Sequence, residues 1–126
     1  MSNAPKQILL VDDDKNLCKL LANAFQEQGF ETAIALNGDA ALEAFKQKPP
    51  ALILLDVAMP GMNGFEVASQ VRALESSGDN HTIIVIMTAH ARSFQVSQEF
   101  EAGIDSYLTK PMRLDDIVAH VVNLLQ

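Results

Sequence analysis

Acidic residues follow two short apolar segments of this chain. The triplet Asp12-Asp13-Asp14 follows a segment near the N-terminus, and Asp56 follows another in the middle. Clustered carboxylates raise one another's pKa values unless a cation neutralises them. Mg²⁺ takes oxygen ligands, commonly one or two carboxylates together with a phosphate oxygen. Asp12, Asp13 and Asp56 are therefore candidate metal ligands, and an aspartate carboxylate is also a nucleophile toward phosphoryl groups.

Two further polar residues end apolar segments in the second half of the chain. Thr88 ends the segment Thr82–Thr88, and Lys110 comes directly after Ser106–Thr109. The lysine offers a compact positive charge with three donors, and the threonine offers a hydroxyl. Phosphoryl transfer requires mainly positioning and electrostatic stabilisation, which these side chains could supply together with a metal ion.

Short apolar segments typical of strands alternate along the chain with segments whose apolar residues recur every three or four positions, as in helices. The predicted strands are Gln7–Val11, Glu31–Leu36, Ala51–Leu55, Thr82–Thr88 and Ser106–Thr109. The predicted helices lie between Asp14 and Gly29 and over Asp39–Lys46, Asn63–Leu74, Ser93–Ala102 and Asp115–Leu125. This alternation predicts an α/β fold, a parallel five-stranded sheet with five helices on both faces in a doubly wound arrangement. Ligand sites of such sheets lie beyond the carboxyl ends of the strands, where the candidate residues stand.

The bulk properties are those of one globular domain. The chain has 126 residues, of which 48% are hydrophobic, and a formal net charge of −7. The negative charge argues against nucleic acid or a membrane as a direct partner. A single cysteine, Cys18, and no visible signal peptide predict a cytoplasmic protein. Residues 1–5 are interpreted as a tag or disordered end, which leaves residues 6–126 for the domain.

Four motifs carry a resemblance to a known family. They are Ile8–Asp14, Leu54–Gly64, Met87–Ala89 and Tyr107–Pro111. In this order they resemble the receiver domain of bacterial two-component response regulators, and the resemblance extends from about Lys6 to the end of the chain. It implies a flavodoxin-like sheet with strand order 2-1-3-4-5. It also implies a signalling switch that takes a phosphoryl group from a sensor histidine kinase or a phosphotransfer protein, without turnover of an external substrate.

The resemblance assigns roles to the candidate residues. Asp56 would be the phosphoacceptor, Lys110 would pair with the phosphoryl group, and Thr88 would donate a hydrogen bond to it. The Lys110–Pro111 peptide bond would be cis. Mg²⁺ would be bound by Asp12, Asp13, Asp56 and the backbone carbonyl of Ala58.

Further residues are implied in switching and in the lifetime of the phosphoryl group. Thr88 and Tyr107 would form the switch, which alters the face made by the fourth helix, fifth strand and fifth helix. The same face could form a homodimer. Ala58 and His90 would flank the phosphoryl group and set its rate of hydrolysis.

Simpler structural roles are predicted for several polar residues. Asp14 is more typical of a helix cap than of a metal ligand. Tyr107 fits an aromatic residue at the edge of the core as well as it fits a switch. His120 is predicted to be solvated, on the last helix.

Two alternative functions remain open at this point. Asp12 and Asp14 have the Asp-x-Asp spacing of haloacid-dehalogenase-type Mg²⁺ phosphatases, although Lys15 departs from the pattern of that family and no cap domain fits the length. A flavodoxin-like binding module or an unphosphorylated receiver is disfavoured, because the first strand is followed by acidic residues and no acidic or lysine position is missing. The output partner or output domain, and whether the chain is a fragment, stay undetermined.

Overall fold

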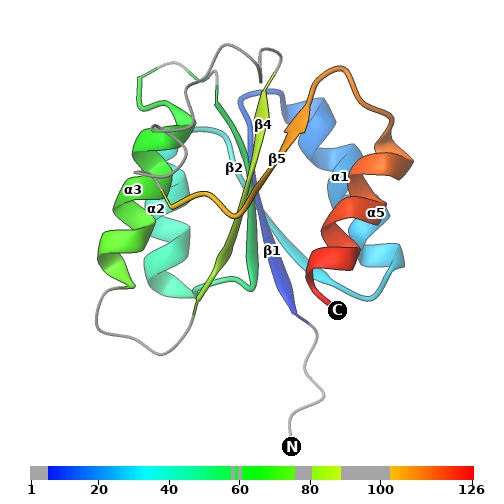
Figure 1. The fold of residues 1–126 in the computed structure, drawn as a ribbon, viewed down its shortest axis with the longest axis horizontal. Helices are drawn as coiled ribbons and strands as arrows, with labels where there is room; N and C mark the ends of the chain where they lie inside the picture. The colour runs from blue at the N-terminus through cyan, green and yellow to red at the C-terminus, as the bar shows by residue number, and fades with distance from the viewer. Residues whose placement is uncertain (1–5, 58, 60, 76–80, 89–102) are drawn as a thin grey trace, which may run out of the picture.

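Five parallel strands form a single sheet in the order β2-β1-β3-β4-β5 within the part of the chain that the computed structural model describes, residues 6–57, 59, 61–75, 81–88 and 103–126. The strands are β1 (Gln7–Val11), β2 (Glu31–Ala35), β3 (Leu52–Asp56), β4 (Ile83–Thr88) and β5 (Ser106–Thr109). The helices in the same ranges are α1 (Lys15–Glu27), α2 (Gly38–Gln47), α3 (Gly64–Leu74) and α5 (Leu114–Leu124). Figure 1 shows α1 and α5 on one face of the sheet and α2 and α3 on the other.

The predicted fold class, strand order and flavodoxin-like winding are confirmed. The boundaries agree within one or two residues; β3, for example, begins and ends one residue later than predicted, so that Asp56 is its last residue. The predicted helix Ser93–Ala102 lies outside the described residues, as do residues 1–5, Ala58 and His90.

Side-chain caps explain why three helices begin soon after a strand ends. Asp14, Asn37 and Asn63 each accept a hydrogen bond from a backbone N–H three residues further on, at 3.1, 2.8 and 3.0 Å. Glu66 accepts in return from the Asn63 N–H at 3.1 Å, which completes a capping box. The predicted role of Asp14 as a cap is thus confirmed.

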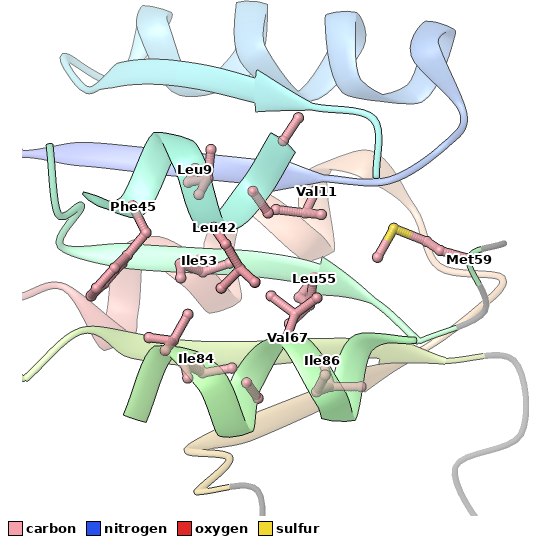
Figure 2. Close-up of a cluster of buried hydrophobic side chains, with 14 of the residues drawn as sticks. Leu9, Val11, Leu42, Phe45, Ile53, Leu55, Met59, Val67, Ile84 and Ile86 are labelled. Atoms are coloured by element: carbon pink, nitrogen blue, oxygen red, sulfur yellow. The ribbon is translucent and has the colours of Figure 1, made fainter. Parts of the chain in front are cut away.

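The core lies in two layers, one on each face of the sheet. Figure 2 shows the layer between the sheet and α2 and α3, to which alternate strand residues such as Leu9, Ile53 and Ile84 contribute. The other layer joins Ile8, Leu54 and their neighbours to α1 and α5. All five residues of β3 are buried. The strand that ends in Asp56 is therefore fixed on both faces.

His120 differs from its predicted solvated position. It is half-buried, and its Nε2 lies 2.8 Å from the Ser106 hydroxyl oxygen. The helical pattern could not show this pair, because Ser106 belongs to the neighbouring strand and the two residues are 14 positions apart.

An ion-pair network that no sequence pattern indicated holds the starts of β4 and β5. The Arg72 guanidinium, in the last turn of α3, lies 2.6 Å from the Glu75 carboxylate and 2.7 Å from that of Asp105. It also donates to the backbone carbonyls of Thr82 and Gly103, at 2.8 and 3.0 Å. These contacts connect the end of α3 to the starts of two strands, away from Asp56.

Replacing Arg72 with Met is expected to lower the free energy of unfolding by about 2 kcal/mol, because the Glu75 and Asp105 carboxylates, whose side chains are 10% and 31% exposed, lose this cation. Urea denaturation measures the change. Lys46→Met is the control, since Lys46 and Glu43 form an exposed pair 3.7 Å apart whose loss should cost less than about 0.5 kcal/mol. Equal midpoints for the two variants would contradict the assigned role of Arg72.

Candidate functional site

The carboxyl ends of β1 and β3 bring three carboxylates together. Oxygens of Asp12, Asp13 and Asp56 all lie within 4.8 Å of one another. Asp12 and Asp56 are only 2% and 6% exposed, whereas Asp13 is exposed. β1 and β3 are neighbours in the sheet, so their ends meet as predicted. The cluster therefore has one side open to solvent and two carboxylates anchored in the core.

Lys110 bridges the two buried carboxylates. Its ammonium nitrogen lies 3.2 Å from Asp12 Oδ2 and 3.3 Å from Asp56 Oδ1. Burial alone would lower the pKa of Lys110, but attraction to Asp12 and Asp56 outweighs it and raises the pKa above the ordinary value of 10.5. The lysine is thus held as a cation between the carboxylates. The Lys110–Pro111 peptide bond that follows is cis, as predicted.

Backbone hydrogen bonds hold together the ends of the strands that carry these side chains. The Val57 N–H donates to the Met87 carbonyl at 3.1 Å, which joins the end of β3 to β4. The Lys110 N–H donates to the Thr88 carbonyl at 2.7 Å, which joins β4 to the residue after β5. Thr88 is buried at the end of β4. The structure thus brings the five predicted residues, Asp12, Asp13, Asp56, Thr88 and Lys110, to one end of the sheet.

The chemistry of this donor set fits Mg²⁺. Three carboxylates within 4.8 Å provide hard oxygen ligands, and the exposed Asp13 leaves room for the waters that Mg²⁺ retains. The carbonyl of Ala58, the fourth predicted ligand, lies outside the described residues.

Tyr107 is also near this end of the sheet, on the edge strand β5. It is opposite Ile86 of β4 in the strand register and is 49% exposed. Its side chain therefore lies at the edge of the sheet, about half exposed to solvent.

Cys18 lies beneath the acidic cluster and is fully buried. Its thiol donates to the Asp12 carbonyl at 3.5 Å. Burial, with smaller contributions from Asp12 and Asp14, raises the pKa of the thiol from 9.0 to about 11. The side chain therefore packs as a small neutral group, as its position in an apolar helix face suggests.

At pH 8.5 we expect Cys18 to react with iodoacetamide at least roughly 100-fold more slowly in the folded protein than in urea, because little thiolate forms. Since the folded pKa is raised, the contribution of Cys18 to stability is complete below pH 9.0 and is lost as the pH rises toward about 11. Urea denaturation across this range should show the decline, and Cys18→Ala should reduce it. Equal alkylation rates with and without urea would contradict the assignment.

The family model "Response regulator receiver domain" matches residues 8–122. The chain belongs to the response regulator receiver domain family. Among curated relatives, the DNA-binding response regulator MtrA of Mycolicibacterium smegmatis is 37% identical to this chain over 121 residues. The aligned region covers 96% of this chain and 51% of MtrA. The receiver domain is 32% identical to the sporulation initiation phosphotransferase F of Bacillus subtilis, covering 89% of this chain and 87% of the relative. The receiver domain thus spans about half the length of MtrA.

Solved structures agree with this assignment. The response regulator TrrA of Thermotoga maritima, in complex with Mg²⁺-BeF, is 34% identical with a TM-score of 0.78 and covers 94% of this chain and 98% of that one. The chemotaxis protein CheY4 of Vibrio cholerae is 24% identical, with a TM-score of 0.82 and coverages of 95% and 98%, and shows the shared fold.

The receiver domain is therefore a phosphorylation switch of a two-component system, as the motifs predicted. Receiver domains work with histidine kinases or phosphotransfer proteins, and their use of Mg²⁺ agrees with the acidic cluster found here. The comparisons do not support the haloacid-dehalogenase alternative. The sequence interpretation missed the hollow beside Lys110, which is lined by Asp14, Leu17, Lys110, Pro111, Met112 and Ile117.

Proposed function

We propose that Asp56 accepts the phosphoryl group in this receiver domain. The donor is a phosphohistidine of a sensor kinase or phosphotransfer protein. A carboxylate oxygen of Asp56 forms a bond to phosphorus as the phosphorus–nitrogen bond breaks, and the electron pair of that bond leaves on the histidine ring nitrogen. The observation that supports this assignment is the position of Asp56, buried at the end of β3, beside two carboxylates and 3.3 Å from the Lys110 ammonium.

Asp12, Asp13, Asp56 and the backbone carbonyl of Ala58 are the proposed ligands of Mg²⁺, in line with the Mg²⁺-BeF complex of TrrA. When bound, the ion neutralises charge on the transferring group. Lys110 balances the remaining charge from the opposite side, and Thr88 donates its hydroxyl. The hollow between Leu17 and Met112 offers apolar surface to the partner protein next to the acceptor.

The proposed output is a change at the face formed by the predicted helix Ser93–Ala102, β5 and α5. Thr88 moves toward the phosphoryl group, Tyr107 follows, and the two pre-existing states of this face change in population. The face binds an output protein or a second copy of the chain. Ala58 and His90 set the lifetime of the phosphoryl group. MtrA is named as DNA-binding, but the match to this chain covers only 51% of MtrA. We do not assign DNA binding to the proposed receiver domain, residues 6–126.

The domain is proposed to act in the cytoplasm and to turn over no external substrate. Within the described residues, no helix is long and apolar enough to cross a membrane.

Incubation with acetyl phosphate and MgCl₂, followed by intact mass measurement, tests the assignment of Asp56. The protein is expected to gain one phosphoryl group, whereas Asp56→Asn and an EDTA-treated sample are expected to gain none. An equal gain in Asp56→Asn would show that another residue is the acceptor, and no gain in the unsubstituted protein would contradict the proposal.

A further inference from the structure

The first residue of α3 lies directly on the backbone of Asp56. The Gly64 N–H donates to the Val57 carbonyl at 3.1 Å. A Cβ atom at Gly64 would lie 2.7 Å from the Asp56 carbonyl oxygen and 3.0 Å from Val57 Cα. Real Cβ atoms essentially never approach within 3.0 Å, so a side chain here would have to displace the Asp56–Val57 peptide group.

The same peptide group is held from the other side. The Val57 N–H, which belongs to this peptide group, donates to the Met87 carbonyl of β4 at 3.1 Å, while the next carbonyl, that of Val57, accepts from Gly64. The end of β3 thus lies between β4 and the first turn of α3. Since the Asp56 carboxylate is 3.3 Å from the Lys110 ammonium, a shift of its backbone changes the geometry of the acceptor directly.

The first turn of α3 is itself fixed. Asn63 and Glu66 exchange hydrogen bonds in the capping box, at 3.0 and 3.1 Å, and Val67, one turn into the helix, is fully buried. The turn therefore holds Gly64 against the backbone of Asp56 and resists moving away from it.

The chain contains a matched copy of this helix start. α2 also begins with an Asn cap followed by glycine, and the Asn37 side chain accepts from the Ala40 N–H at 2.8 Å. A Cβ atom at Gly38 would lie 2.9 Å from Met62 Cβ and 3.0 Å from Val67 Cγ2. The crowding is similar at the two glycines, but Gly38 touches side chains whereas Gly64 touches the acceptor's own backbone.

We propose that Asn63 and Gly64 are positioning residues for phosphoryl acceptance: the first turn of α3 fixes the Asp56 peptide and thereby the carboxylate. This inference rests on the proposed role of Asp56. It predicts that disturbing the start of α3 slows phosphorylation of correctly folded molecules, while the same disturbance at the start of α2, which does not touch the Asp56 backbone, has a much smaller effect on the rate.

Gly64→Ala and Gly38→Ala provide the first comparison. Both variants are expected to lose stability, which urea denaturation measures. At saturating acetyl phosphate and MgCl₂, the phosphorylation rate per folded molecule should fall about 10- to 100-fold in Gly64→Ala, because small displacements of reacting groups have effects of this size. In Gly38→Ala the rate should fall by less than about threefold, because the added Cβ would meet the side chains of Met62 and Val67 and not the Asp56 backbone. Equal maximal rates for the two variants would overturn the proposal.

The two asparagine caps provide a second comparison, in which the substitutions remove side-chain atoms and add none. This comparison tests the positioning role of the first turn of α3 even if Gly64→Ala does not fold. Asn63→Ala and Asn37→Ala each remove one cap, at a similar cost in stability. The maximal rate is expected to fall about threefold or more in Asn63→Ala but not in Asn37→Ala, and Asn63→Ser, which can still cap, should restore it. Equal rates for the two alanine variants would overturn the role of the turn. If the unsubstituted protein gains no phosphoryl group, the assignment of Asp56 fails first and this inference fails with it.

Discussion

Replacing Asp13 with Asn is expected to remove most of the stabilisation of the protein by Mg²⁺ and to slow phosphorylation roughly 100-fold. Asp13 is the exposed member of the carboxylate cluster, so its loss removes an ion ligand without opening the core. The unsubstituted protein should gain about 2.7 kcal/mol in unfolding free energy at a Mg²⁺ concentration 100 times the dissociation constant. Urea denaturation with and without MgCl₂ measures this difference.

The direction in which Asp13→Asn changes the unfolding free energy without Mg²⁺ is a more specific test of the ligand set. Because like charges lie within 4.8 Å of one another, Asp13→Asn should raise the unfolding free energy of the metal-free protein by about 0.5 kcal/mol. Asp14→Asn is the matched control, since it removes a neighbouring charge while asparagine can still cap α1. Full Mg²⁺ stabilisation in Asp13→Asn, or its loss in Asp14→Asn, would contradict the assigned ligand set.

Replacing Lys110 with Met is expected to slow phosphorylation roughly 100-fold, because the charge opposite the metal site is lost. The metal-free protein should also lose about 2 kcal/mol of unfolding free energy, since the Asp12 and Asp56 carboxylates, with side chains 3% and 8% exposed, lose their bridging cation. Mg²⁺ should then bind more tightly than to the unsubstituted protein, because the ammonium no longer competes for these carboxylates. Mass measurement and denaturation at several MgCl₂ concentrations follow the two effects.

Lys48→Met is the control for Lys110→Met. Lys48 pairs with Glu31 at 2.9 Å, but both side chains are exposed, so the loss should be within about 0.5 kcal/mol and should leave phosphorylation unchanged. Weaker Mg²⁺ binding in Lys110→Met than in the unsubstituted protein would contradict the competition between the ammonium and the ion.

The sequence predicted the sheet and most of the site because both depend on local patterns. Asp12 and Lys110 follow apolar strands, Asp56 ends one, and the carboxyl ends of neighbouring parallel strands meet at one edge. The pattern could not show that the ammonium of Lys110 bridges two carboxylates, because that geometry depends on side-chain conformations.

The sequence pattern could not predict side-chain contacts between distant segments of the chain. Arg72 and Asp105 are 33 positions apart, and neither belongs to a motif. The contact of Gly64 with Asp56 could not be predicted, since a glycine in a sequence does not show which backbone lies against it. The pair of His120 and Ser106 was missed for the same reason.

The network around Arg72 has a mechanical consequence for the sheet. It clamps β4 and β5 where they begin, whereas Thr88 and Lys110 stand where these strands end. We therefore expect any displacement caused by a new charge at Asp56 to be smallest where Arg72 holds the starts of the two strands and to be larger beside the acceptor, with the register of β4 and β5 unchanged.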